Sequence, residues 1–175
     1  LSFKKHPKQP QLYPIIFAVM SNVVTPYNDT RSKKRQVEEM FDNIAHRYDF
    51  LNHLLSFGID ITWRKKAVKY IGTIHPKKIL DVASGTGDFA FEALSLHPEK
   101  IIAFDLSEGM MKYGREKANR LNVSNVVEFV KGDSEKMPFA SSSFDAITVG
   151  FGVRNFENLS VGLEEIFRVI RKDGK

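Results

Sequence analysis

The sequence predicts an α/β protein with a doubly wound parallel sheet. Short apolar runs typical of buried strands alternate with longer segments of helical periodicity. A glycine-rich turn, Gly85-Thr86-Gly87, follows the first predicted strand and opens a helix, and Asp105 closes the next strand eighteen residues after Gly87. Strands separated by helices pair in parallel through right-handed crossovers, so we expect one sheet with helices on both faces.

Two helices precede the sheet in this prediction, over residues 36–55 and 62–71. In the first, apolar residues recur every three or four positions, which is typical of a helix with one buried side. The second is expected to face inward through Trp63, Ala67, Val68 and Ile71.

The remaining elements follow in strict alternation until the fourth strand. Strands are predicted over 78–83, 100–105, 126–130 and 144–149, and helices over 88–96, 108–121 and 159–170. The last helix is expected to face the sheet through Leu163, Ile166, Phe167 and Ile170.

Composition limits the possible classes of protein. A chain of 175 residues, 42% of them hydrophobic, is typical of one domain with a substantial core. The absence of cysteine excludes a disulfide framework and a thiol nucleophile. No apolar run approaches the length of about 18 residues that a membrane-spanning helix needs, so we expect a soluble or peripheral protein.

The positive charge is concentrated at the N-terminus. Residues 1–35 contain seven lysines and arginines and one aspartate, a balance of +6, whereas the whole chain carries +5. We expect residues 1–35 to be a disordered basic tail or a non-native extension, because Met20 is the first methionine. A targeting peptide is the alternative. The simplest interpretation of the charge is a solvated tail, and attraction of this tail to anionic lipid or nucleic acid is the alternative. A basic tail on a neutral domain does not predict a nucleic-acid-binding surface on the domain itself.

The charges around the glycine turn indicate which cofactor it holds. Its pattern fits a dinucleotide site, but Asp81 precedes it and Asp88 follows it. Two carboxylates would repel a pyrophosphate and suit a ligand with an ammonium and a sulfonium, which points to S-adenosylmethionine. Asp105 is placed to accept hydrogen bonds from ribose hydroxyls. A plain tight turn, with Asp88 capping the helix, is the structural alternative.

Further candidates lie where the later strands end, because ligands of such sheets bind beyond the carboxyl ends of the strands. Asp133 and Ser134 follow the third strand, and Asp133 is expected either to accept a hydrogen bond from an adenine amino group or to cap its loop. Arg154 and Asn155 follow the fourth strand. Arg154 is expected either to stabilise a phenolate-like acceptor or to pair with a carboxylate. Nothing in the sequence suggests a metal site.

The chain resembles the ubiquinone/menaquinone biosynthesis C-methyltransferases, a family of class I S-adenosylmethionine-dependent enzymes that includes demethylmenaquinone methyltransferases. The resemblance spans residues 37–175. The glycine turn and Asp105 are shared by many methyltransferases, whereas two segments are more specific to this family. They are Arg47-Tyr48-Asp49-Phe50-Leu51-Asn52 and Phe151-Gly152-Val153-Arg154-Asn155.

The resemblance implies a Rossmann-like fold and methylation of a ring carbon of a polyprenylated quinol. Residues 36–76 would form helices over the substrate pocket, and residues 77–175 the cofactor-binding sheet. The expected cofactor contacts are Asp81, Gly85, Thr86, Gly87, Asp105, Asp133 and Ser134. Arg154 would act electrostatically, with Asn155, Tyr48 and Asp49 as candidates for holding a ring oxygen. Gly150 departs from the family, which often has serine there.

The resemblance also implies a setting and leaves alternatives open. The substrate lies in lipid, so we expect a cytoplasmic protein in transient contact with the membrane surface, or a mitochondrial matrix protein in a eukaryote. A homo-oligomer or a biosynthetic complex is a further expectation. Naphthoquinol and benzoquinol acceptors both fit. The rival functions are methylation of another small molecule, an NAD-dependent oxidoreductase and a non-catalytic cofactor-binding subunit.

Family members continue with further strands after the helix that follows strand 4. We therefore expect a C-terminally truncated sheet, in which strand 4 is an unpaired edge. Such a chain is expected to keep the cofactor half of the site but to be less stable, and to be inactive if the far wall of the quinol pocket is required.

Overall fold

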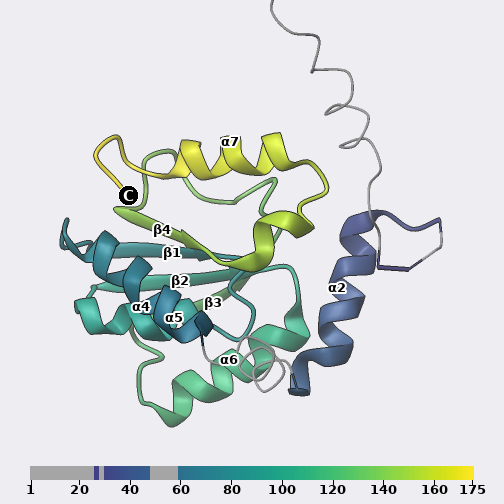
Figure 1. Cartoon of the computed structure of the whole chain (residues 1–175), viewed down its shortest axis with the longest axis horizontal. Helices are drawn as coiled ribbons and strands as arrows, with labels where there is room; N and C mark the ends of the chain where they lie inside the picture. The colour runs from purple at the N-terminus through teal and green to yellow at the C-terminus, as the bar shows by residue number, and fades with distance from the viewer. Residues whose placement is uncertain (1–25, 28–29, 48–58) are drawn as a thin grey trace, which may run out of the picture.

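The computed structural model describes residues 26–27, 30–47 and 59–175, and it contains one parallel sheet (Figure 1). The strand order is β3-β2-β1-β4, and every neighbouring pair is parallel. The strands are β1 (Lys78–Val82), β2 (Lys100–Asp105), β3 (Val127–Lys131) and β4 (Ala146–Val149). The predicted doubly wound α/β fold is confirmed.

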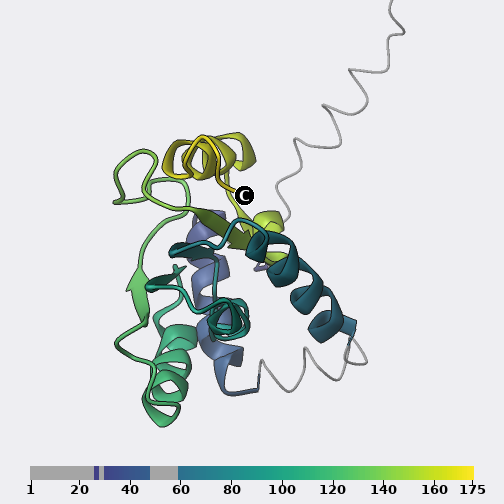
Figure 2. The same ribbon diagram turned by 90° about the vertical axis from the view of Figure 1, so that its left-hand side faces the viewer.

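Helices cover both faces of the sheet (Figures 1 and 2). One face packs against α4 (Ile59–Gly72), α5 (Asp88–Ala93) and α6 (Glu108–Arg120), and the other against α7 (Leu159–Val169). Side chains of successive strand residues point to opposite faces. Ile79 therefore belongs to the core under α4, α5 and α6, whereas its neighbour Leu80 belongs to the core on the α7 side. None of the described helices is long and apolar enough to cross a membrane.

The first helix, α2 (Lys33–Ile44), begins three residues earlier than predicted. The Ser32 side chain caps it by accepting a hydrogen bond from the Arg35 backbone N–H. Gln36 is fully buried, and its side-chain amide bonds to the backbone of Tyr27 and Arg31. A 3₁₀ turn at Ala45–Arg47 follows the helix. The rest of the predicted helix, over 48–55, lies outside the described residues.

The orientation predicted for the second helix is wrong at one position. Trp63 was expected to face inward, but it is 60% exposed, whereas the neighbouring Arg64 is buried. Arg64 shares the inner face of α4 with Val68 and Ile71, since residues three and four apart lie on one side of a helix. Arg64 takes the inner position instead, where its guanidinium pairs with Asp60 and Asp88.

The packing face predicted for α7 is right at Ile166, which packs against the core on the α7 side of the sheet, and wrong at two other positions. Leu163 and Phe167 were expected to face the sheet, but Phe167 is 82% exposed, and Leu163 is exposed as well. The buried positions are Gly162 and Val169. Phe156 lies against Gly162 so closely that a Cβ there would be 2.3 Å from the ring. The absence of a side chain at Gly162 therefore fixes which side of α7 approaches the sheet.

The outer edge of β4 is partly covered, contrary to the prediction of an unpaired edge. Phe144 forms an isolated parallel bridge with Ile170. The Ile147 N–H donates to the Lys175 carbonyl at 2.7 Å, and the Lys175 N–H donates to the Asp145 carbonyl at 3.1 Å. The last residues of the chain therefore satisfy backbone groups of this edge.

Candidate functional site

The glycine turn has an unusual backbone at three positions between β1 and α5. Ala83, Gly85 and Gly87 have φ angles of 52°, 58° and 88°. A Cβ at Gly87 would lie 2.7 Å from the Phe129 ring, so a glycine is required there for both conformation and space. At Gly85 a Cβ would lie 3.0 Å from the end of Met110. The turn therefore brings backbone, rather than side chains, to the edge of the sheet.

Asp105, at the end of β2, is bound to this turn. One carboxylate oxygen accepts the Gly85 N–H at 2.7 Å, and the other accepts the Ser107 N–H at 2.8 Å. Burial raises the pKa of Asp105, although these backbone donors act in the opposite direction. The carboxylate is thus fixed beside the glycine turn, where a ligand hydroxyl could reach it.

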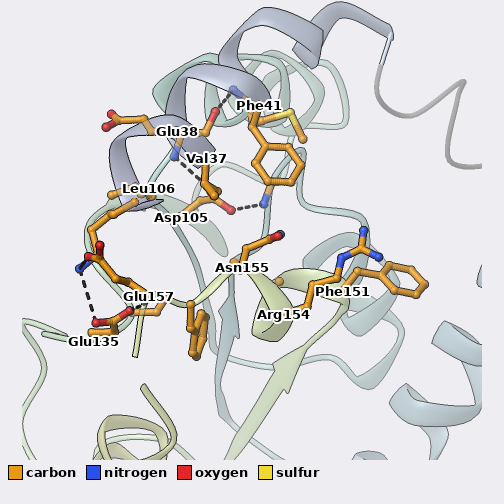
Figure 3. Close-up of a pocket in the computed structure, with 18 residues that line it drawn as sticks. Val37, Glu38, Phe41, Asp105, Leu106, Glu135, Phe151, Arg154, Asn155 and Glu157 are labelled. Carbon is orange, nitrogen blue, oxygen red and sulfur yellow. Dashed lines mark hydrogen bonds and ion pairs between the residues drawn. The ribbon is translucent and has the colours of Figure 1, made fainter. Parts of the chain in front are cut away.

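A first cavity lies between Asp105 and α2 (Figure 3). It encloses about 780 Å³ of space between atoms, part of it open to solvent. Its wall on the α2 side consists of Lys34, Val37, Glu38 and Phe41. The facing wall includes Ala83, Gly85, Asp105, Leu106, Ser107, Met110, Ser134, Glu135, Phe151, Gly152, Arg154 and Asn155. Helix α2 therefore acts as one side of a site at the carboxyl ends of β1 and β2.

The two predicted residues after β4 line this cavity, but their side chains diverge. Asn155 lies near Asp105, whereas Arg154 extends alongside Phe151 (Figure 3). The Arg154 guanidinium is 5.9 Å from the centre of the Phe151 ring, in cation–π contact. Both residues belong to a 3₁₀ helix, Phe151–Asn155. Lys33 of α2 donates to the Phe156 carbonyl, directly after this helix, at 2.8 Å.

A second cavity adjoins the glycine turn, and Ala83 and Phe151 line both cavities. Its wall is rich in charged and polar side chains: Asp60, Arg64, Asp81, Ser84, Thr86 and Asp88. Gly150 and Phe89 complete it. The predicted cofactor residues are therefore divided, with Asp105 and Ser134 at the first cavity and Asp81 and Thr86 at the second.

Asp81 is almost fully buried beneath the glycine turn. The Ser84 and Thr148 hydroxyls donate to its two carboxylate oxygens, each at 2.7 Å. Burial raises its pKa to about 6, although these donors and the Ala90 N–H lower it, and the nearby Asp105 raises it further. The ionised form of Asp81 is therefore stabilised by hydroxyl and backbone N–H donors.

Asp88 is held by two cations, which changes the charge argument made from sequence. Its carboxylate pairs with Arg64 and with Lys117, the latter at 2.9 Å. Burial alone would raise its pKa, but these cations hold the pKa of Asp88 below its usual value. Asp81 therefore remains as the carboxylate that disfavours a pyrophosphate.

Asp133 does not line the first cavity, although its neighbour Ser134 does. Its carboxylate pairs with Lys34 of α2 at 2.6 Å and accepts the Glu135 N–H at 2.9 Å. Lys34 also lies 3.6 Å from Glu135. The adenine contact at Asp133 stays a prediction. Tyr48 and Asp49 lie outside the described residues.

Lys34 and Arg64 line the two cavities, although neither was among the residues predicted for the site. Lys34 was counted with the basic N-terminal residues, and nothing local distinguishes it from the others. Arg64 gave a detectable signal: it lies four residues after Asp60, the spacing of a helical ion pair, and it interrupts an apolar stripe.

Comparison with known proteins gives a consistent result. The model of the ubiE/COQ5 methyltransferase family matches residues 29–175. A demethylmenaquinone methyltransferase of Bacteroides fragilis is 50% identical over 152 residues, which are 86% of this chain and 62% of the relative. A ubiquinone/menaquinone biosynthesis C-methyltransferase of Geotalea uraniireducens is 44% identical over 145 residues, 82% of this chain and 62% of the relative.

A solved structure agrees with the fold. The crystal structure of a SAM-dependent methyltransferase from Aquifex aeolicus is 29% identical, with a TM-score of 0.54 over 62% of this chain and 58% of that one. The chain spans 62% of the length of the curated relatives above. Because the family model matches residues 29–175, most of this chain, the chain belongs to the ubiE/COQ5 methyltransferase family.

Proposed function

We propose that this protein transfers the methyl group of S-adenosylmethionine to a ring carbon of a polyprenylated quinol. Membership of the ubiE/COQ5 family supports methyl transfer, and the names of the relatives, a demethylmenaquinone methyltransferase and a ubiquinone/menaquinone biosynthesis C-methyltransferase, support a quinol acceptor. Because this chain spans only part of their length, the activity, the substrate and the partners are all inferred for the whole protein.

The residues of the site fit this cofactor. The glycine turn lies beside two adjoining cavities, which suits a nucleoside with an amino-acid tail. Asp105 carries the proposal: its carboxylate is fixed by two backbone N–H groups in the wall of the first cavity, where a ribose diol could bind it. Asp81 at the second cavity favours a cationic group over the pyrophosphate of NAD.

The chemistry needs a positioned, electron-rich ring carbon. When bound, S-adenosylmethionine would supply an electrophilic methyl group: the ring carbon would bond to it as the carbon–sulfur bond breaks with its electron pair on sulfur, and the proton of that ring carbon would pass to water. The protein contributes mainly by orienting the two reactants. We assign Asn155 to hold a ring oxygen in the first cavity. We assign Arg154 to increase the phenolate character of the acceptor by its charge.

The substrate class suggests where the protein works. A polyprenylated quinol resides in lipid, so we infer a cytoplasmic protein in transient contact with a membrane surface. Residues 36–76 are inferred to cover the substrate pocket, and the α2 part of this segment supports that role by lining the first cavity. Assembly into a homo-oligomer or a biosynthetic complex is part of the same proposal.

The test is transfer of a labelled methyl group by the full-length protein. Demethylated naphthoquinol and benzoquinol acceptors are offered separately with labelled S-adenosylmethionine, and Asp105→Asn is the control for the cofactor site. Transfer to either acceptor supports the proposal and names the ring. Cofactor binding without transfer to either would exclude the quinol assignment, and tighter binding of NAD than of S-adenosylhomocysteine would exclude the cofactor.

A further inference from the structure

The outer side of α4 carries exposed apolar and aromatic side chains. Ile59, Trp63 and Tyr70 are each more than half exposed, and their spacing of four and seven residues places them in one stripe along the helix. The buried residues Arg64 and Val68 lie on the inner side. Figure 2 shows α4 on the outside of the molecule. A continuous apolar stripe in this position indicates an interaction surface.

Positive charge accompanies this stripe. Three lysines of α4 are exposed: Lys65, Lys66 and Lys69. Among the described residues none of these lysines has an ion-pair partner. A further cation, Lys175, lies over the Tyr70 ring, with its amino nitrogen 4.3 Å from the ring centre. The one carboxylate of α4, Asp60, pairs with Arg64. The outer side of α4 therefore combines apolar rings with uncompensated positive charge.

Helix α7 also exposes apolar side chains, but its charge differs from that of α4. Leu163 and Phe167 are exposed on the opposite face of the sheet. Helix α7 contains two glutamates and one arginine, a balance of −1. Helix α4 contains one aspartate, one arginine and three lysines, a balance of +3. An anionic surface would therefore attract α4 and repel α7.

We propose that the outer side of α4 is the surface by which the protein docks onto an anionic lipid bilayer. Tryptophan and tyrosine rings are favoured at the level of lipid headgroups, where the ring is in an apolar setting and its polar atom is hydrated. Lysine stems lie along apolar surface while their amino groups reach anionic headgroups. Shallow insertion of the stripe is sufficient, since none of the described helices is long and apolar enough to cross a membrane.

Docking through α4 would bring the candidate site close to the lipid. Asp60 and Arg64 line the second cavity from the inner side of this helix. A helix with its side chains is about 10 Å across, so a lipid surface on the outer side would lie about that far from the cavity. A quinol ring could then enter the site while its polyprenyl tail stays in the bilayer. This inference rests on the proposed function, because a lipid-resident acceptor is the reason for the contact.

The test is flotation of the full-length protein with vesicles of phosphatidylcholine, with and without phosphatidylglycerol. The wild type should bind the anionic vesicles more strongly, and added salt should weaken this binding. The triple variant Lys65→Gln/Lys66→Gln/Lys69→Gln should lower partitioning into anionic vesicles by about 10- to 100-fold. Trp63→Ala should lower it by about tenfold, because one ring no longer leaves water. Thermal midpoints should not change, since these side chains are exposed.

The matched controls exchange the same kinds of side chain elsewhere. Phe167→Ala removes an exposed ring from α7, and Lys112→Gln removes an exposed lysine from α6. Neither should change partitioning. Equal losses in the α4 variants and the controls, or no loss in the α4 variants, would overturn the assignment. Absence of vesicle binding by the wild type would overturn it as well.

Two further measurements separate this inference from its alternatives. Trp63 fluorescence, taken as the difference between the wild type and Trp63→Phe, should be open to a soluble quencher until anionic vesicles are added. Shielding without vesicles would mean that another part of the protein covers α4, and the inference would fail. With a short-tailed, water-soluble quinol acceptor, the α4 variants should keep the wild-type rate of methyl transfer. Vesicle binding by a wild type that transfers no methyl group would exclude the proposed function and leave the docking surface standing.

Discussion

Asp81 shows how one buried carboxylate can be stabilised without an ion pair. Its described partners are the hydroxyls of Ser84 and Thr148 and the backbone N–H of Ala90. These dipoles compensate only part of the hydration lost on burial, so burial raises the pKa of Asp81 to about 6. A bound ammonium would supply the missing countercharge.

Asp81 is expected to make stability depend on pH. Between about pH 4 and 6 the folded protein binds this proton more tightly than the unfolded chain does, so the contribution to stability is complete below pH 4 and is lost as the pH rises through about 6. In Asp81→Asn this component is absent. The free energy of unfolding of the wild type, relative to that of the variant, should fall by roughly 2 kcal/mol from pH 4 to pH 7. Denaturant unfolding at both pH values measures the change, and a pH-independent difference between the two proteins would contradict it.

At the scale of elements, one carboxylate joins α2 to α6. The Asp42 side chain accepts from the Ser107 hydroxyl at 2.5 Å and from the Gly109 N–H at 2.8 Å. Ser107 itself caps α6 by accepting from the Met110 N–H. Asp42 therefore places a negative charge at the N-terminus of α6, where the helix dipole favours it, and holds α2 over the first cavity.

We expect Asp42→Ala to destabilise the protein by about 1–2 kcal/mol, the cost of losing a helix cap. Amide hydrogen exchange should increase at the first turn of α6 and along α2, since the same oxygen serves both elements. Asn43→Ala is the control, because Asn43 is the exposed neighbour of Asp42. Faster exchange confined to α6 would show that this contact does not hold α2.

At the scale of the molecule, the sheet separates two cores. One lies beneath α4, α5 and α6, and the other joins β1, β2 and β4 to α7. Phe104 is fully buried in the second, with its ring 5.2 Å from that of Phe139. In contrast to Phe104, Phe167 lies on the outer side of α7 and is 82% exposed.

Two identical substitutions should therefore have different effects in this chain. Phe104→Ala removes a fully buried ring and is expected to cost about 3–5 kcal/mol of unfolding free energy. Phe167→Ala should remain within about 0.5 kcal/mol of the wild type, as for most exposed positions. Thermal and denaturant unfolding give both values. A large loss at Phe167 would mean that α7 packs through the face predicted from its sequence.

Local patterns were sufficient for the elements and for the glycine turn. Alternation of apolar runs with helical segments predicted the order of strands and helices from residue 78 onward, because each pattern reports the period of its own element. The turn at Gly85 and Gly87 and the position of Asp105 were also predictable, since tight turns and strand ends have recognisable residues. Their roles toward a cofactor stay predictions.

Tertiary structure decided which side of each helix is buried and which charges meet. Trp63 is exposed because α4 turns Arg64 inward, and Phe167 is exposed because α7 turns Gly162 toward Phe156. Asp88 and Lys117 are 29 residues apart, and Lys34 and Asp133 are 99 apart. The sequence by itself determined a parallel α/β sheet with a glycine turn and an acidic strand end. Only the tertiary structure decided which of its charges pair, because an ion pair depends on distance in space and a local pattern reports only distance along the chain.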